Sequence, residues 1–176
     1  TPAQRWLAVH ATRFAQPAIF ALEWSLSEMW KARGVVPAIV LGHSIGELAA
    51  ACVAGAMSME DGIRLTAERG KLMQALPTGE GSMMAVRSDA TAVANAIASA
   101  SVGDSVSVAA VNGPRNVIIS GAKDGVNRVL AKLGEPGFRL EVSHAFHSPL
   151  MQPAAVKFQE VAASVTFAPC TIPMAS

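Results

Sequence analysis

Apolar residues at helical spacing mark the first helix that the sequence predicts. Its apolar face consists of Ile19, Leu22, Leu26 and Met29 or Trp30. Gln16 and Pro17 come directly before this face, and Gly34 comes after it. Proline at the first helical position and glycine beyond the last turn are typical helix boundaries. The pattern therefore predicts a helix that begins at Gln16 and Pro17 and ends before Gly34.

A continuous apolar run follows this helix. Residues 35–41 read VVPAIVL, with Pro37 near the start. Such a run is typical of a short parallel strand that is buried on both faces. The glycines of segment 42–46 then allow a sharp turn into a helix over 45–54. The pattern thus predicts a strand, a tight turn and a helix in direct succession.

The order of elements changes after a third helix. Ser58 and Asp61 have the spacing of a capping box for a helix over 59–76. After the break PTGEG, we expect strand 82–86, helix 90–100, strand 106–111, a turn at 112–114, strand 116–120, helix 123–133 and strand 138–142. This order is that of the ferredoxin-like split unit. A helix over 152–164 and the start of a strand between Pro169 and Pro173 complete an α/β chain.

Composition and charge exclude several classes of protein. Apolar residues make up 51% of the 176 and charged residues 15%, so we expect a buried core rather than disorder. No apolar run approaches the ~18 residues of a membrane span. The net charge of +1 is spread along the chain, which argues against nucleic acid and anionic membranes as partners. We expect Cys52 and Cys170 to be buried, reduced thiols.

The strongest chemical signal is the segment GHSIG at 42–46. A G-x-S-x-G between a buried strand and a helix is the setting of a nucleophile elbow, which exposes the serine hydroxyl. Backbone N–H groups at the start of the next helix, notably that of Ile45, would point to a developing oxyanion. We therefore predict that Ser44 is a nucleophile and that Ile45 contributes half of an oxyanion hole.

A serine nucleophile needs a base, and the chain offers four histidines. The four are His10, His43, His144 and His147; His43 adjoins Ser44, but neighbours on so tight a turn seldom bring their side chains together. His144 and His147 lie in a loop that follows the last strand of the split unit. The residues alone leave open which of these two is the base. Their spacing also fits a metal pair, but no third ligand stands at a matching distance, so we expect no metal.

Arg69 shares a helical face with apolar residues, namely Leu65, Leu72, Met73 and Leu76. A guanidinium on such a face remains charged and must find an anion. The spacing alone leaves open whether that anion is a structural carboxylate or the carboxylate of a substrate.

Four motifs in one order resemble the malonyl-type acyltransferase domains of polyketide synthases. They are GHSIGE at 42–47, ERGKLMQ at 68–74, VNGPRNVIISG at 111–121 and HAFHSPLM at 144–151. The resemblance runs nearly end to end, and QPAIFAL at 16–22 is similar to the first helix of that family. It implies an α/β-hydrolase-like large subdomain with a parallel sheet over 1–79 and 144–176. It also implies an inserted ferredoxin-like small subdomain over 80–143.

The resemblance assigns roles to individual residues. It implies that Ser44 carries a malonyl ester and that His147 is the general base in a ping-pong transfer. Arg69 would hold the malonyl carboxylate. Phe146 would leave little room for the extra methyl of methylmalonyl, and His144, His43 and Met73 complete the expected substrate-binding set. The implied partners are malonyl-CoA, an acyl carrier protein with its phosphopantetheine thiol, and neighbouring domains of a cytoplasmic synthase, with no resident cofactor.

The chain departs from the family pattern at both ends. The family's N-terminal Gly-Gln-Gly segment and its last strands and helix are absent, so we expect a truncated domain. Position 1 is not Met, and His10 and Arg13 interrupt the first stretch, so we expect no signal peptide and a start inside a longer polypeptide.

Three other functions compete with this interpretation. A free-standing malonyl transacylase would share the nucleophile, arginine and base, although the HAFH motif favours the polyketide setting. A serine hydrolase or thioesterase would need an acid between Ser and His, but Asp89, Asp104 and Asp124 all fall in small-subdomain elements. A non-catalytic remnant is disfavoured by the intact Ser44, Arg69 and His147.

Overall fold

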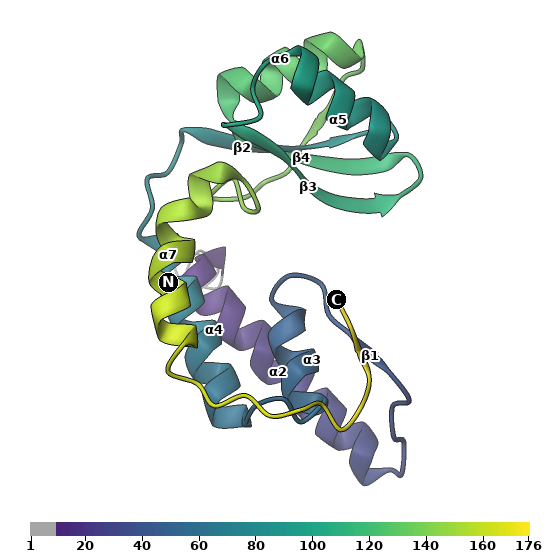
Figure 1. Cartoon of the computed structure of the whole chain (residues 1–176), viewed down its shortest axis with the longest axis vertical. Coiled ribbons are helices and arrows are strands. Elements are labelled where there is room, and N and C mark those ends of the chain that lie inside the picture. Colours follow the sequence, from purple (N-terminus) through teal and green to yellow (C-terminus); the bar gives the residue numbers. More distant parts are fainter. Residues whose placement is uncertain (1–9) are drawn as a thin grey trace, which may run out of the picture. The chain divides into compact units, whose positions relative to one another are not determined.

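The computed structural model describes residues 10–176, whose contacts divide the chain into two units. The first unit comprises residues 10–75 and 156–176, and the second comprises residues 76–155 (Figure 1). The predicted subdomain boundaries were 79/80 and 143/144, so the second unit also includes segments 76–79 and 144–155. The reason is packing, because the His144 ring bonds to the Leu76 carbonyl. The expectations for residues 1–9 lie outside the described residues.

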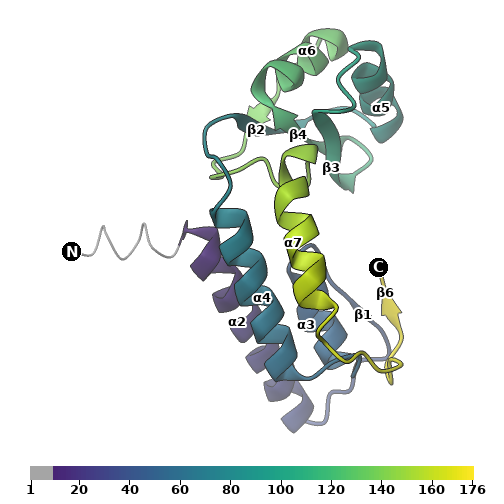
Figure 2. The same cartoon turned by 60° about the vertical axis from the view of Figure 1, so that its left-hand side comes forward.

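Helices dominate the first unit, and their buried sides form its core. The helices are α2 (Thr12–Ala32), α3 (Gly46–Val53), α4 (Met59–Gln74) and α7 (Gln152–Ala162), of which α7 enters the unit at Val156. The core residues are Phe20, Ala49, Cys52, Met57, Leu65 and Val165. A side chain at Gly62 would meet the Cys52 sulfur at 2.4 Å and the Phe20 ring at 2.6 Å. Because α4 has no side chain at Gly62, it can pack closely against Phe20 of α2 and Cys52 of α3. Figure 2 shows α2 and α4 side by side.

Helix α2 corrects two expectations. It begins at Thr12 rather than at Gln16, so Pro17 lies inside it and removes one backbone donor. The predicted apolar face is exposed, with 42% exposure for Ile19, 60% for Leu22 and 53% for Trp30. The buried positions of α2 are instead Thr12, Gln16 and Phe20, which lie toward α4. The apolar residues do share one face of α2 as predicted, but the expectation of burial fails, because another face of α2 packs in the first unit.

The predicted strand over 35–41 is also much shorter than expected. Only β1 (Val40–Leu41) forms, and it pairs in parallel with β6 (Met174–Ala175). Val36 is 74% exposed and Leu41 is 76% exposed, so the prediction of burial on both faces was wrong. Burial on both faces requires a strand on either side and cover above and below. Within residues 10–176, β1 has one partner strand.

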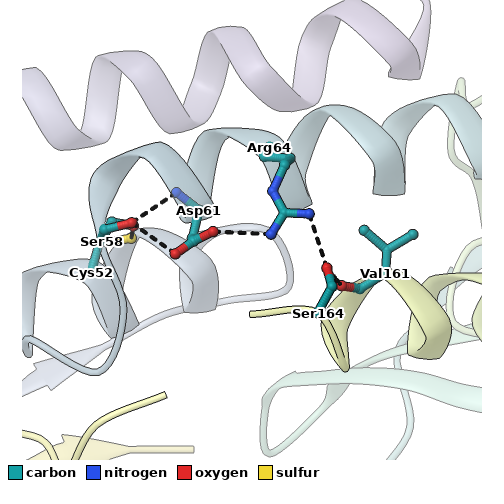
Figure 3. A network of polar contacts seen from close by, with 6 residues as sticks. All are labelled: Cys52, Ser58, Asp61, Arg64, Val161 and Ser164. Carbon is teal, nitrogen blue, oxygen red and sulfur yellow. Dashed lines mark hydrogen bonds and ion pairs between the residues drawn. The ribbon is translucent and has the colours of Figure 1, made fainter. Parts of the chain in front are cut away.

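Helix α4 begins at the predicted cap and is tied to the segment after α7. Ser58 Oγ accepts the amide of Asp61 at 3.0 Å and donates to the Asp61 carboxylate at 2.9 Å. Arg64 donates to Asp61 at 3.0 Å and to Ser164 Oγ at 3.0 Å (Figure 3). The Arg64 bonds lower the pKa of the exposed Asp61 carboxyl. The capping residues and their arginine thus connect the start of α4 to the end of the α7 segment.

The two cysteines differ in burial and in chemistry, contrary to the expectation that both are buried. Cys52 is buried and its thiol donates to the Ser58 carbonyl at 3.3 Å, whereas Cys170 is exposed. Burial raises the pKa of Cys52 to about 11, and the nearby Asp61 and Glu60 carboxylates add to the effect.

At about pH 8, we expect iodoacetamide to modify Cys170 and to leave Cys52 unmodified in the folded protein. The thiolate is the reactive form, and only about one Cys52 in a thousand would carry it at that pH. Peptide mapping of the time course measures both sites. A Cys170→Ser variant should lose the fast reaction, and equal labelling of Cys52 in the native protein would contradict the burial described here.

The second unit has the predicted order of elements. Its antiparallel sheet has the order β3-β4-β2-β5, built from β2 (Gly81–Val86), β3 (Val106–Gly113), β4 (Asn116–Ala122) and β5 (Phe138–Arg139). Helices α5 (Ala90–Ser99) and α6 (Lys123–Leu133) cover one face (Figure 1). The turn lies at Pro114 and Arg115 rather than at 112–114, because Gly113 still pairs with Asn116. Strand β5 ends at Arg139 rather than at 142.

Aliphatic side chains fill the space between this sheet and its helices. The most buried are Val86, Val93, Val106, Val117, Ile119, Val126 and Val129. Gly121 and Gly125 let the end of β4 and the start of α6 approach β3, since side chains there would meet Ser105 and Val106 atoms. The unit thus has its own hydrophobic core. Ser107 of β3 donates to the His147 carbonyl, which connects the loop with His144 and His147 to this sheet.

Candidate active site

The turn between β1 and α3 holds Ser44 in a conformation that few non-glycine residues adopt. Its φ is +52°, in the left-handed region, which costs about 1 to 3 kcal/mol. A side chain at Gly42 would meet the backbone of Glu47 at 2.3 Å, so only glycine fits there. The amides of Gly46 and Glu47 donate to the carbonyls of His43 and Ser44. The segment is therefore a tight, strained turn of the kind that presents a nucleophile.

Arg69 of α4 reaches the Ser44 hydroxyl. Its Nη2 donates to Ser44 Oγ at 3.1 Å, and its Nη1 donates to the Gln16 amide oxygen at 2.6 Å. Arg69 is half-buried rather than fully buried. Desolvation lowers the pKa of its guanidinium and the Glu47 carboxylate raises it, but a guanidinium stays protonated in proteins. The geometry brings a cation directly to the predicted nucleophile.

The two loop histidines differ in burial. His144 is 4% exposed, and its Nε2 donates to the Leu76 carbonyl at 3.0 Å, so Nε2 carries a proton. Its Nδ1 lies 2.8 Å from Ser143 Oγ. His147 is exposed, and its φ of +57° is in the left-handed region. His144 therefore has both ring nitrogens bound in a structural role, whereas the His147 ring lies at the surface of the second unit.

The loop around His147 is held by hydroxyl groups. Ser107 donates to the His147 carbonyl at 2.6 Å, and Ser148 donates to the Ala145 carbonyl at 2.6 Å. Ser148 also caps a 3-10 turn, Pro149–Met151, that leads into α7. The Phe146 ring is half-buried and lies 5.8 Å from the His144 ring. Packing and hydrogen bonds thus fix the backbone that carries His147.

Residues 10–176 lack two kinds of feature, a cluster of metal ligands and a helix able to span a membrane. These residues contain no group of three or more His, Cys, Asp or Glu side chains arranged to hold a metal ion. Among the helices of the same residues, none combines the length and apolar character needed to cross a lipid bilayer.

Comparison with known proteins identifies the family. A model of the acyl transferase domain family matches residues 6–176. The chain belongs to the acyl transferase domain family. Polyketide synthase GfsA of Streptomyces halstedii is 48% identical over 162 residues, which are 90% of this chain and 2% of that protein. The resemblance inferred from the four motifs is confirmed at the level of the family.

Two solved structures extend the comparison of this acyl transferase domain. The acyltransferase domain from the second module of the salinomycin polyketide synthase is 45% identical with a TM-score of 0.90, over 96% of this chain and 40% of that one. An acyl carrier protein S-malonyltransferase from Vibrio cholerae is 34% identical with a TM-score of 0.89. The match covers 95% of this chain and 57% of that one. The α/β fold is thus confirmed, and the chain spans about half the length of these solved relatives.

The candidate site in the first unit contains one residue that sequence reasoning missed. Gln16 was noted as a helix start, but it is buried and contacts Arg69, Thr12 and the Met73 sulfur. Of the other expected residues, Met73 thus contacts the site through Gln16, whereas His43 is exposed on the turn and Ile45 is the N-cap of α3. The i, i+4 spacing of Thr12 and Gln16 was visible, but such pairs are common and carry no specific signal.

Replacing the two loop histidines should have opposite consequences. For His144→Ala, we expect a loss of about 2 to 4 kcal/mol of unfolding free energy, because a buried ring and the donor to Leu76 disappear. For His147→Ala, at an exposed position, we expect a smaller loss of unfolding free energy than for His144→Ala but an acyl-loading rate lower by about 100-fold or more. Thermal unfolding and single-turnover loading measure the two effects. A stable His144→Ala and an active His147→Ala would reverse the assignment.

Proposed function

We propose that the chain is the acyltransferase of a polyketide synthase and that Ser44 accepts a malonyl group from malonyl-CoA. The acceptor of that group would be the phosphopantetheine thiol of an acyl carrier protein. The observation that carries this proposal is the bond from Arg69 to Ser44 Oγ. A guanidinium beside the nucleophile suits an acyl group with a second, negatively charged carboxylate.

The proposed reaction proceeds in two half-reactions. His147 takes the proton of the Ser44 hydroxyl as its oxygen attacks the thioester carbon, and the backbone amide of Ile45 stabilises the oxyanion. The C–S bond then breaks, and the protonated imidazole returns its proton to the leaving thiolate. In the second half-reaction the carrier-protein thiol gives its proton to His147 and attacks the malonyl ester. Ser44 regains its proton, so the enzyme is unchanged.

Substrate selection in this proposal depends on charge first and on shape second. Malonyl provides the anion that the Arg69 guanidinium needs, whereas acetyl leaves that half-buried charge without a carboxylate. The half-buried Phe146 ring would reject the extra methyl of methylmalonyl, which is worth only about 1 to 3 kcal/mol. Discrimination against acetyl should therefore be stronger than discrimination against methylmalonyl.

The wider setting is proposed on the same basis. The 48% and 45% identities to polyketide synthase sequences exceed the 34% identity to the S-malonyltransferase, which favours the polyketide setting over a free-standing transacylase. We infer a cytoplasmic multidomain synthase without a resident cofactor. The first unit would be the α/β-hydrolase-like large subdomain and the second the ferredoxin-like small subdomain.

Release of coenzyme A tests transfer against hydrolysis. In the native polypeptide that contains these residues, malonyl-CoA alone should give a burst of one equivalent of coenzyme A and a slow steady rate. Adding a phosphopantetheinyl carrier protein should give many turnovers and malonylated carrier by mass spectrometry. The carrier without its phosphopantetheine arm is the control. Rapid steady release that is independent of the carrier would show a hydrolase instead.

A further inference from the structure

Gln16 is a buried polar side chain whose amide nitrogen and amide oxygen both form hydrogen bonds. It is 6% exposed and lies on the side of α2 that packs toward α4. Its Nε2 donates to Thr12 Oγ1 at 2.7 Å and to the Met73 sulfur at 3.3 Å. Its Oε1 accepts from Arg69 Nη1 at 2.6 Å. A buried amide with partners at both ends has one favoured orientation.

That orientation is fixed by the chemistry of the partners. A guanidinium only donates, so the Gln16 group that faces Arg69 must be the amide oxygen. Reversing the amide would bring its NH₂ group against the guanidinium and leave two sets of donors unpaired in a buried place. Thr12 and Met73 accept from the other end. The network therefore orders Gln16 so that its oxygen holds one arm of Arg69.

The consequence for Arg69 is geometric. A guanidinium is planar and rigid, so fixing Nη1 on Gln16 also fixes the direction of Nη2, which reaches Ser44 Oγ. Lysine could not transmit orientation in this way, because its ammonium rotates freely.

The choice of an amide also matters for charge. Among residues 10–176, no Asp or Glu oxygen lies within 4.0 Å of the Arg69 guanidinium, and its side-chain hydrogen bonds go to the uncharged Gln16 and Ser44. The Glu47 carboxylate, which raises the pKa of Arg69, acts from beyond that distance. A carboxylate at position 16 would hold the guanidinium equally well but would neutralise it. A neutral amide orients the guanidinium and leaves its charge available to an incoming anion.

We propose that Gln16 is a positioning residue that aims Arg69 at the acyl carboxylate without neutralising it, and thereby determines acyl selectivity. This inference rests on the proposed function. It makes the neutral state of residue 16, and not only its size, a requirement for selecting a charged acyl group.

Two substitutions separate orientation from charge. Gln16→Leu removes the acceptor, so Arg69 loses its orientation, and the kcat/KM for malonyl-CoA should fall by about 10-fold to 100-fold, mostly through KM. Gln16→Glu keeps an acceptor but gives Arg69 a permanent anion. The ratio of malonyl to acetyl loading should then fall by at least about tenfold, because acetyl no longer leaves the guanidinium unpaired.

A milder variant and a matched control complete the design. Thr12→Val leaves the Gln16 amide with only the Met73 sulfur as acceptor, so its effect on KM should have the same sign as Gln16→Leu and be smaller. Gln159→Leu makes the same chemical change at an exposed position of α7 and should change neither rate nor selectivity.

The first measurement is single-turnover loading with malonyl-CoA and with acetyl-CoA, in the native polypeptide that contains these residues. The second is thermal unfolding of every variant. A purely structural Gln16 would lower the melting temperature in the Leu and Glu variants and leave the malonyl-to-acetyl ratio unchanged, which would overturn the inference. Retention of that ratio by a folded Gln16→Glu variant would overturn it as well. Failure of the wild-type protein to acquire malonyl would instead reject the proposed function.

Discussion

Replacing Ser44 with alanine is expected to abolish formation of the acyl-enzyme. The Ser44 hydroxyl oxygen is the atom proposed to form the ester with the acyl group. Loss of a serine nucleophile lowers turnover by roughly a millionfold in a well-studied serine protease. The fold should survive, because the turn depends on Gly42 and on backbone hydrogen bonds rather than on the hydroxyl. Rapid-quench loading followed by intact mass spectrometry measures the loss.

A matched control for this substitution exists in the second unit. Ser101 has the same φ of +52° and is exposed, so Ser101→Ala makes an identical chemical change at an equally strained backbone position. It should leave loading unchanged. Equal loading of wild type and Ser44→Ala would show that another group is acylated and would remove the nucleophile from the account.

The second large effect is expected for Arg69→Ala. The kcat/KM for malonyl-CoA should fall roughly 30-fold to 4000-fold, which corresponds to a loss of about 2 to 5 kcal/mol of transition-state stabilisation. The substrate carboxylate would then have lost its cation in a partly desolvated place. Acetyl-CoA has no such carboxylate, so its loading should change by less than about tenfold. Arg69→Lys should recover only part of the loss, because an ammonium lacks the planar fork.

Arg64→Ala is the matched control for Arg69, since both arginines lie on α4. Arg64 is exposed, lies nearer the start of α4 than Arg69, and bonds to Asp61 and Ser164 rather than to Ser44. Its removal should slightly destabilise the protein and leave selectivity unchanged. Equal losses for malonyl and acetyl loading in Arg69→Ala would mean that Arg69 supports the fold or the nucleophile rather than the carboxylate.

Local signals predicted the second unit and the caps well. The boundaries of α6 match the expected 123–133, and Ser58 caps α4 as its spacing with Asp61 predicted. These features depend on contacts between residues close in sequence, which periodicity and capping chemistry capture. The tight turn at Ser44 could be predicted for the same reason, because it is encoded within five consecutive residues.

Features that depend on distant partners were harder to predict. The apolar residues of α2 and of segment 35–41 indicated burial, yet Leu22 and Val36 are exposed, because exposure depends on which surfaces cover them. Gln16 contacts Arg69, which is 53 positions away, and no local pattern indicates that pairing. The residues alone likewise left open whether His144 or His147 is the base, and only the resemblance favoured His147. The contact of the His144 ring with the distant Leu76 carbonyl has no local signal in the sequence.

The most direct test of the account is a competition for Ser44. The native polypeptide that contains these residues would be mixed with equal amounts of malonyl-, methylmalonyl- and acetyl-CoA, and the acyl group would be identified by intact mass and located by peptide mapping. The account predicts a malonyl adduct on Ser44, with a smaller amount of methylmalonyl. Predominant acetyl loading, or a malonyl adduct on another residue, would contradict it.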